Sequence, residues 1–214
     1  MKKKKTLILA LAFFLAFAIW TFLIMTADVS VAGQSETPVG LSGLNTRFFD
    51  LTGVNMTLYT VTDWAGLIPV AVCLVFAALG LCQLVGRKSL FKVDGDILLL
   101  GGYYVLVIFC YLLFEKVPIN YRPILIDGRP EASYPSSTTL LTLSVMPTLI
   151  FQAKRRLKST ALKNAVTALS LAFSVFVVLG RLVSGVHWLT DIIGGALLSV
   201  ALFSGYRAAV LFFI

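Results

Sequence analysis

Charged residues and histidine are both scarce in this sequence. Of the 214 residues, 13% are charged and 58% are hydrophobic, whereas apolar residues make up roughly 45–50% of a typical soluble domain. This composition excludes an ordinary soluble domain and indicates an integral membrane protein. Three cysteines lie in apolar stretches without the spacing of metal ligands, and we interpret them as small core residues. They are Cys73, Cys82 and Cys110.

No internal repeat, low-complexity tract or linker divides the chain, so we expect one domain over residues 1–214. The hydrophobic residues gather into six segments, each near the roughly 20 residues that cross a hydrocarbon layer as a helix. The fourth segment is short and contains Pro147. The six are Thr6–Met25, Gly66–Gly86, Ile97–Phe114, Thr138–Ala153, Ala165–Val183 and Asp191–Phe213. The sequence therefore predicts an all-α integral membrane bundle of six transmembrane helices.

The first segment follows a run of four lysines, a pattern that signal peptides and uncleaved first helices share. The apolar run Thr6–Met25 is longer than the roughly 7–15 residues of a signal peptide's hydrophobic region. Ala27 leaves cleavage open. We expect an uncleaved first helix.

The basic residues predict an orientation, because cytoplasmic loops of membrane proteins are rich in Lys and Arg. With the first lysines inside, an even number of spans places thirteen of the eighteen basic residues on the cytoplasmic side. These are Lys2–Lys5, Arg87, Lys88, Lys92, Lys154, Arg155, Arg156, Lys158, Lys163 and Arg207. We expect a multi-pass protein of the cell membrane with both termini cytoplasmic. Its basic surplus fits anionic membrane lipids as partners and needs no nucleic acid.

Two long loops are predicted on the outer face, at residues 27–65 and 115–138. The first contains an apolar, aromatic stretch, Phe48–Tyr59, that is too polar to span. It is either a loop packed on the helix ends or an interfacial helix that guides a lipid substrate sideways into a site. We favour the interfacial helix.

The second loop holds three cations, Lys116, Arg122 and Arg129, together with several hydroxyl groups. Its four prolines restrict the backbone and remove hydrogen-bond donors, so the loop should be stiff and not helical. The prolines are Pro118, Pro123, Pro130 and Pro135. In the six-helix arrangement this loop and residues 180–191 reach the same membrane surface.

Residues 180–191 contain Arg181, His187 and Asp191, a polar group that is costly near hydrocarbon and therefore indicates a functional site. Positions 187 and 191 share one helix face if a helix begins by Trp188. A carboxylate beside a histidine fixes the ring tautomer and leaves the other nitrogen as a nucleophile or base. Neighbouring Arg and Lys side chains suit a phosphate. One His and one Asp among cations form a poor metal site.

A purely structural interpretation is also open, in which His187 is an interfacial residue and Arg181 pairs with Asp191. The second cationic loop on the same face makes this interpretation less favourable. In the functional interpretation, the cations hold the phosphate headgroup of a lipid while His187 attacks phosphorus in line. The resulting phosphohistidine is then hydrolysed by water.

These residues resemble the type 2 phosphatidic acid phosphatase superfamily, whose pattern is Lys-x6-Arg-Pro, Pro-Ser-Gly-His and Ser-Arg-x5-His-x3-Asp. The third part is met by Arg181-x5-His187-x3-Asp191, with Gly180 in place of Ser. In the first part only five residues separate Lys116 from Arg122. The second part becomes Pro135-Ser136-Ser137-Thr138. The resemblance covers about residues 116–191 and the helix plan.

The resemblance implies a role for each matching residue. His187 would be the nucleophile and Asp191 its orienting carboxylate. The implied phosphate-binding residues are Lys116, Arg122, Ser136, Ser137, Thr138 and Arg181. The family's second-part histidine, which protonates the leaving group, has Thr138 in its place. No cofactor is implied.

The missing acid bears on the substrate. Loss of a general acid costs about 10²–10⁴ in rate when the leaving group is an alkoxide, and less when it is a phosphate, whose second pKa is about 6. One hypothesis is therefore a polyprenyl diphosphate substrate, such as undecaprenyl diphosphate; another is a phospholipid phosphate. Alternatively, a nearby side chain supplies the proton, with Asp127, Glu131 and Tyr134 as candidates.

Two further functional classes remain as alternatives. Loss of the acid histidine would suit a weak or inactive relative that binds or carries phosphorylated lipids. Retention of His187 and Asp191 favours the enzyme, because a binder needs no such pair. A channel or transporter would require polar residues at mid-membrane, and few are visible in the sequence.

Overall fold

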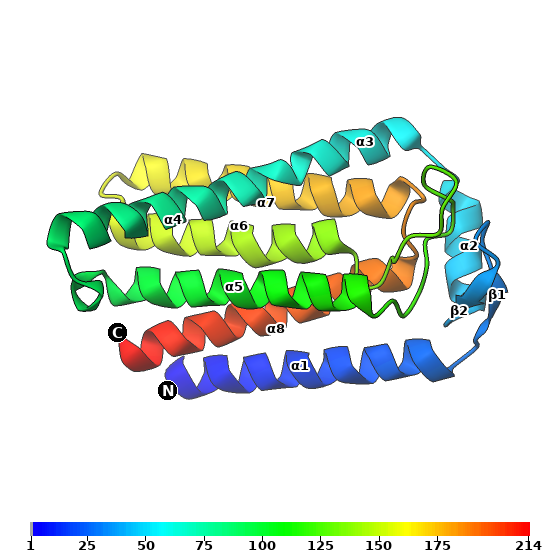
Figure 1. Cartoon of the computed structure of the whole chain (residues 1–214), viewed down its shortest axis with the longest axis horizontal. Coiled ribbons are helices and arrows are strands. Elements are labelled where there is room, and N and C mark those ends of the chain that lie inside the picture. Colours follow the sequence, from blue (N-terminus) through cyan, green and yellow to red (C-terminus); the bar gives the residue numbers. More distant parts are fainter. Residues whose placement is uncertain (1) are drawn as a thin grey trace.

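The computed structural model describes residues 2–214, which form a bundle of long, roughly aligned helices (Figure 1). The eight α-helices in these residues are α1 Lys2–Thr26, α2 Ser42–Thr52, α3 Met56–Ala65, α4 Leu67–Arg87, α5 Gly95–Lys116, α6 Ser137–Arg156, α7 Thr160–Val183 and α8 Leu189–Phe213. A 3₁₀ turn lies at Leu90–Lys92. Strands β1 Ser30–Ala32 and β2 Thr37–Val39 form an antiparallel hairpin with Ser30 opposite Val39.

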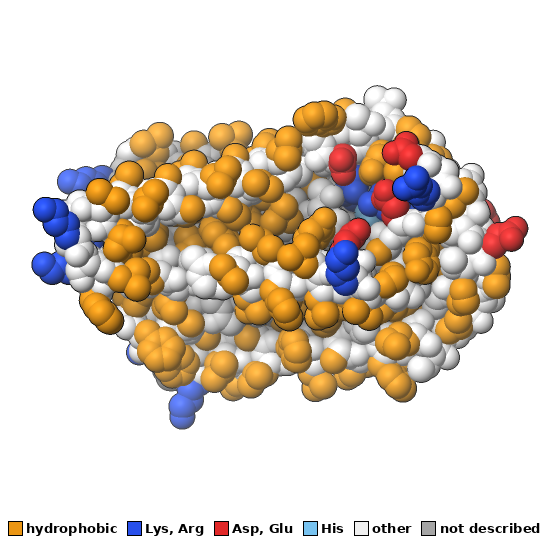
Figure 2. Space-filling view, viewed as in Figure 1, with side chains coloured by type: hydrophobic (Ala, Val, Ile, Leu, Met, Phe, Trp, Pro, Cys, Tyr) orange, Lys and Arg blue, Asp and Glu red, His pale blue; other side chains and the backbone are white. Residues whose placement is uncertain are grey.

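Five stretches of helix in the described residues are long and apolar enough to cross a membrane. They correspond to α1, α3 continued by α4, α5, α7 and α8. Hydrophobic side chains cover the flank of the bundle, whereas the charged side chains gather toward its two ends (Figure 2). This distribution is the one that a hydrocarbon layer requires, and the chain is a multi-pass membrane protein.

The sixth long helix, α6, is polar and lies inside the bundle against α4, α5, α7 and α8. Thr142, Ser144 and Thr148 are buried along it. The Tyr103 hydroxyl donates to the Ser144 carbonyl over 3.0 Å, and Tyr104 Oη lies 2.7 Å from Thr148 Oγ1. Polar groups inside a membrane protein need protein partners rather than lipid. This explains why the polar α6 lies at the centre of the bundle. Its polar residues explain why hydropathy alone identifies it weakly; the count of six spans stays a prediction.

Helix α1 is an integral part of the bundle. It packs along α8 over much of its length, so that both ends of the chain lie at the same end of the bundle (Figure 1). Trp20 Nε1 donates to the Thr190 carbonyl over 3.1 Å, and the Phe17 ring stacks on Tyr134. The first helix therefore supports the start of α8.

Residues 27–65 contain more structure than the predicted interfacial helix. They form the β1–β2 hairpin, then α2 and α3, and α3 continues into α4 at Gly66. The Asn55 side chain caps α3 by accepting a hydrogen bond from the Leu58 N–H over 2.9 Å. The predicted second segment, Gly66–Gly86, matches α4 within one residue at each end. The apolar stretch extends back through α3 to Met56, where threonines and Asp63 lower the hydropathy.

The loop between α5 and α6 is not helical, as its prolines predict. Two short antiparallel bridges, Tyr121 with Ala132 and Ile126 with Arg129, fold it on itself. The turn of the β1–β2 hairpin holds it from outside, since the Gln34 N–H donates to the Pro123 carbonyl over 2.8 Å. A Cβ on Gly33 would lie 2.7 Å from that carbonyl oxygen, so this close approach requires glycine. The hairpin therefore positions the loop that carries Arg122.

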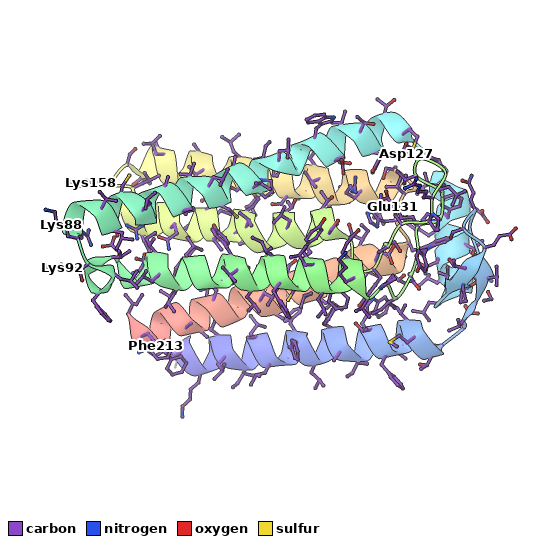
Figure 3. All side chains as sticks on the ribbon, in the orientation of Figure 1. Lys88, Lys92, Asp127, Glu131, Lys158 and Phe213 are labelled. Atoms are coloured by element: carbon purple, nitrogen blue, oxygen red, sulfur yellow. The ribbon has the colours of Figure 1, made fainter. Side chains whose placement is uncertain are left out.

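The two ends of the bundle differ in charge. Lys88, Lys92 and Lys158 lie at one end, which we call the basic end, and Asp127 and Glu131 lie at the other, the site end (Figure 3). At the basic end Arg156 lies 3.0 Å from Asp94 and 2.7 Å from Asp96. Hydrogen bonds from Arg87, Arg156 and Gln83 lower the pKa of Asp94 to about 2. These ion pairs connect α4, α5 and α6 at the basic end.

Candidate active site

His187 and Asp191 meet where α7 passes into α8. His187 lies in the connecting turn and Asp191 in the first turn of α8, and both are buried. His187 Nδ1 is 3.6 Å from Asp191 Oδ2. The same carboxylate oxygen accepts a hydrogen bond from the Trp188 N–H over 2.9 Å, so Asp191 also stabilises the start of the helix. The carboxylate is thus fixed beside the imidazole ring, as the i, i+4 spacing predicts.

The turn before His187 is fixed by the connection between α2 and α3. Gly185 has φ of 67°, and a Cβ there would overlap the Gly53 carbonyl oxygen. The Asn55 N–H donates to the Ser184 carbonyl over 3.0 Å. A glycine is therefore required by both backbone conformation and space, and the turn holds His187 against its surroundings.

Arg181 and Arg122 approach the same side of His187. Arg181 Nη2 lies 3.4 Å from His187 Nε2, the ring nitrogen that does not face Asp191. The guanidinium groups of Arg181 and Arg122 lie 4.8 Å and 5.7 Å from the centre of the Tyr59 ring. Tyr59 on α3 therefore contacts both cations through its aromatic ring and holds them together.

Several buried donors at this place have no hydrogen-bond partner within the described residues. They include Arg122 Nε and Nη1, Arg181 Nε, Ser136 Oγ and His187 Nδ1. Arg122 Nε lies 3.2 Å from Glu131 Oε2, at ion-pair distance but without the alignment of a hydrogen bond. An unsatisfied buried donor is costly, most of all on a charged group. This arrangement suits an anion that accepts from several donors at once.

The start of α6 faces the same group. Ser136 is the residue before the helix, and its N–H donates to the Asp191 carbonyl over 3.1 Å. The first N–H groups of a helix have no partner within it, and together with the helix dipole they favour an anion. Loop 117–136, the start of α6 and the start of α8 thus meet at the candidate site.

Burial, followed by the positive charges of Arg122 and Arg181, lowers the pKa of His187 well below its ordinary value of 6.5. The imidazole is therefore neutral at pH 7. Nδ1 faces Asp191 and Nε2 faces Arg181, so the tautomer protonated on Nδ1 is the one that leaves the Nε2 electron pair free. A neutral nitrogen beside cations has the properties of a nucleophile toward a bound phosphate.

The other predicted phosphate ligands differ in position. Ser137 and Thr138 line a mostly apolar cavity of about 430 Å³ between α4, α5 and α6, with Asp63 and Tyr111 at its polar side. Lys116, at the last residue of α5, is exposed. No contact joins Lys116 to Arg122, Arg181 or His187 in the part of the chain that the structure describes.

The proposed alternative proton donors are poorly placed. The Tyr134 hydroxyl lies 2.7 Å from Thr21 Oγ1 on α1, inside the hydrophobic core. Asp127 lies in the outer turn of the loop with φ of 49°. Glu131 is close, but it faces Arg122.

Two residues of the site, Tyr59 and Asp63, were not predicted from the sequence because they belong to no motif. The available signal was their i, i+4 spacing ahead of an apolar helix.

Asp63 contacts Arg181, the arginine next to His187. Asp63 Oδ1 lies 3.4 Å from Arg181 Nη1. Its side chain keeps 56% of its surface exposed, whereas that of Arg181 keeps 1%. Within residues 2–214 no group of three or more His, Cys, Asp or Glu residues has the arrangement of a metal site.

Comparison with known proteins identifies the fold and the family. No curated protein matches the sequence. Among solved structures, the chain is similar to a transmembrane PAP2 type phosphatidylglycerolphosphate phosphatase from Bacillus subtilis, with a TM-score of 0.69 and 18% identity over 96% of this chain and 98% of that one. The model of the PAP2 superfamily matches residues 2–212, and the chain belongs to this superfamily.

Proposed function

We propose that this protein is a membrane phosphatase that hydrolyses a lipid phosphate or lipid diphosphate through a phosphohistidine. One observation carries the proposal. The buried His187 presents Nε2 to Arg181, next to guanidinium donors of Arg122 and Arg181 that lack partners. An enzyme for phosphate transfer needs this combination of a neutral nucleophile and preorganised cations.

In this mechanism Arg122, Arg181 and the first N–H groups of α6 hold the phosphate. His187 Nε2 attacks phosphorus, the bond to the leaving oxygen breaks, and the imidazolium that forms is stabilised by Asp191. Water then attacks the phosphohistidine and releases inorganic phosphate. Ser136 Oγ, buried and without a partner, is proposed as a further phosphate contact. The exposed Lys116 is assigned only to attracting the anionic headgroup.

The lipid tail is proposed to occupy the apolar cavity that Thr138 lines. Its walls of Leu and Val from three helices suit an acyl or prenyl chain. The excess of lysine and arginine at the basic end supports a cytoplasmic location for that end and for both termini. The site end then faces the outside of the cell membrane, where it meets headgroups of the outer leaflet.

A lipid-phosphate binder without turnover is the second candidate. Thr138 favours it, because threonine cannot replace the acid histidine of the family. The pairing of His187 with Asp191 favours the enzyme, since binding of phosphate requires cations but no nucleophile.

The two candidates are separated by phosphate release from lipid monophosphates and diphosphates by the purified protein, with chelator present. We expect turnover by the wild type, and a loss of at least about 1,000-fold in His187→Ala, because the nucleophile is removed. Thermal unfolding of the variant serves as the folding control. Activity that survives His187→Ala would refute the nucleophile, and dependence on added metal would refute the metal-free mechanism.

A wild type that binds lipid phosphates but releases no phosphate from any of them would establish the binder instead. Binding is measured by co-sedimentation with vesicles that contain the lipid phosphate. Binding by His187→Ala equal to that of the wild type is expected under both candidates, so turnover decides between them.

A further inference from the structure

Asp63 lies at the boundary between the phosphate site and the apolar cavity. Its carboxylate is 3.4 Å from the Arg181 guanidinium, which in turn is 3.4 Å from His187 Nε2. The same side chain lines the cavity together with Thr138. Among the residues lining the cavity it is the one carboxylic acid in the part of the chain that the structure describes. An acid is therefore present at the junction of headgroup and tail.

A departure from the family pattern allows α3 to bring Asp63 so close. Gly180 stands where the pattern has Ser, and a Cβ there would lie 2.5 Å from Thr62 Cγ2. The Thr62 side chain is buried and its hydroxyl donates to the Leu58 carbonyl over 2.8 Å, so it has little freedom to move aside. A larger residue than glycine at position 180 would push α3 outward. Asp63, one residue further along α3, would move with it.

The second departure from the family pattern, Thr138, lies beside the junction of α3 and α4. A Cβ on Gly66 would be 3.5 Å from Thr138 Cγ2, so the junction of α3 and α4 packs against Thr138. Thr138 stands where the family pattern has its acid histidine. Asp63 is three residues before Gly66, about one helical turn away. The structure therefore places a carboxylic acid near the position from which the family's acid is missing.

We propose that Asp63 is the proton donor to the leaving oxygen, a role that rests on the proposed phosphatase function. In this arrangement Arg181 holds the phosphate against His187 Nε2, and the lipid tail lies in the cavity. The leaving oxygen is the atom that joins the phosphate to the tail. That oxygen lies at the polar side of the cavity, where Asp63 and Thr138 face it. In-line attack requires the leaving group to depart on the side away from the nucleophile, which is the side of the lipid.

The proton and electron balance closes over the two steps. In the first, the His187 Nε2 electron pair forms the P–N bond, the P–O bond to the lipid breaks, and its oxygen takes the Asp63 proton to give the free lipid alcohol. In the second, water attacks phosphorus and gives a proton to the Asp63 carboxylate. The P–N bond breaks, its electron pair returns to Nε2, and inorganic phosphate leaves.

This role widens the range of substrates. A site without an acid is limited to leaving groups that are stable as anions, such as the phosphate of a diphosphate. With Asp63 as donor, a lipid phosphate monoester, whose leaving group is an alkoxide, also becomes a substrate.

The test compares two leaving groups in the Asp63→Asn variant. The probes are a long-chain alkyl phosphate and 4-nitrophenyl phosphate, in the same detergent. We expect kcat for the alkyl phosphate to fall about 10²–10³-fold, because general acid catalysis is worth about 10²–10⁴, and kcat for the aryl phosphate to fall less than about fivefold. Asp63→Glu, which keeps the acid, should retain at least a tenth of wild-type turnover. Asp50→Asn, at an exposed acid of α2, is the matched control and should be unchanged.

An equal loss on both phosphates would overturn the proposal, since Asp63 would then act only by holding Arg181. Unchanged hydrolysis of the alkyl phosphate by Asp63→Asn would overturn it as well. If the wild type releases phosphate from lipid diphosphates but hydrolyses neither probe, the proposed phosphatase function stands and the role of Asp63 fails. If it releases phosphate from no lipid phosphate or diphosphate, both fail. If the wild type is active and His187→Ala is not, the function stands and the leaving-group comparison alone decides the role of Asp63.

Discussion

The two ends of the bundle use the same residue types in opposite ways. At the basic end Arg156 lies within 3.0 Å of both Asp94 and Asp96. At the site end, Arg122 and Arg181 are almost completely buried, and guanidinium nitrogens on both lack a hydrogen-bond partner within the described residues. Each has one carboxylate nearby, at 3.2 Å and 3.4 Å respectively.

This difference is the one expected between a structural cluster and an anion-binding site. Arginines that are fully paired with carboxylates connect helices and leave little for a ligand to gain. Buried arginines with unused donors are costly to the folded protein, and an anion that fills those donors recovers the cost. Counting charged residues would have treated the two ends alike; counting unused donors distinguishes them.

The same substitution at each end is the strongest way to test the comparison. Arg181→Lys keeps the charge but loses the planar fork, and loss of one charged hydrogen bond, about 1.5–3 kcal/mol, corresponds to about a 10–100-fold fall in kcat/KM. Arg156→Lys should change kcat/KM less than twofold. Phosphate release by both purified variants measures this. Equal losses in the two variants would contradict the distinction between the ends.

The opposite pattern is expected when stability is measured. Asp96 is buried and lies 2.7 Å from Arg156 and 3.4 Å from Arg155. Asp96→Asn should destabilise the protein by about 1–3 kcal/mol, because two arginines lose their shared partner, and should lower Tm by a few degrees. Turnover at a temperature below the transition should remain at the wild-type level. Thermal unfolding in detergent and phosphate release test the two statements; a fall in turnover with unchanged Tm would reverse the assignment of the two ends.

The smallest expected effect is the absence of a histidine step in the pH profile of kcat/KM. Because burial and the neighbouring arginines lower the pKa of His187, the ring stays neutral well below pH 6.5. Its nucleophilic form is present above its lowered pKa and is lost only as the pH falls through it. We therefore expect kcat/KM, which reports on the free enzyme, to lack a fall assignable to His187 between pH 7 and 6. A histidine limb near pH 6.5 that disappears in His187→Asn would contradict this.

Much of the fold could be predicted because it depends on local patterns. Five apolar runs are long helices, and the proline-rich loop is not helical. The polar α6 was the weakest prediction because its threonines and serines lower its hydropathy, and its place in the bundle depends on tertiary contacts. The Tyr103 hydroxyl donates to the Ser144 carbonyl, and the Tyr104 hydroxyl contacts that of Thr148. Helix α3 was missed for the same reason, since its polar residues face neighbours that lie far away in the sequence.

The site was predictable where the motif spacing fixes geometry, as for His187 and Asp191 on successive turns. It was not predictable where partners come from distant segments. Tyr59 contacts two arginines, and Asp63 faces Arg181 across 118 positions of sequence. The sequence showed only that Gly180 stands in place of the motif's Ser. In the folded protein, the missing side chain leaves the space into which Thr62 of α3 packs.

The packing of α1 on α8 has a consequence for biosynthesis. Trp20 and Thr190, which form a hydrogen bond at the site end, are 170 positions apart in the chain. Helix α1 is therefore made well before α8, the helix that carries Asp191. Until α8 inserts, the face of α1 that packs on α8 is uncovered in the membrane, and the candidate site lacks Asp191. A ribosome that stalls before this point leaves a fragment in the membrane without the complete candidate site.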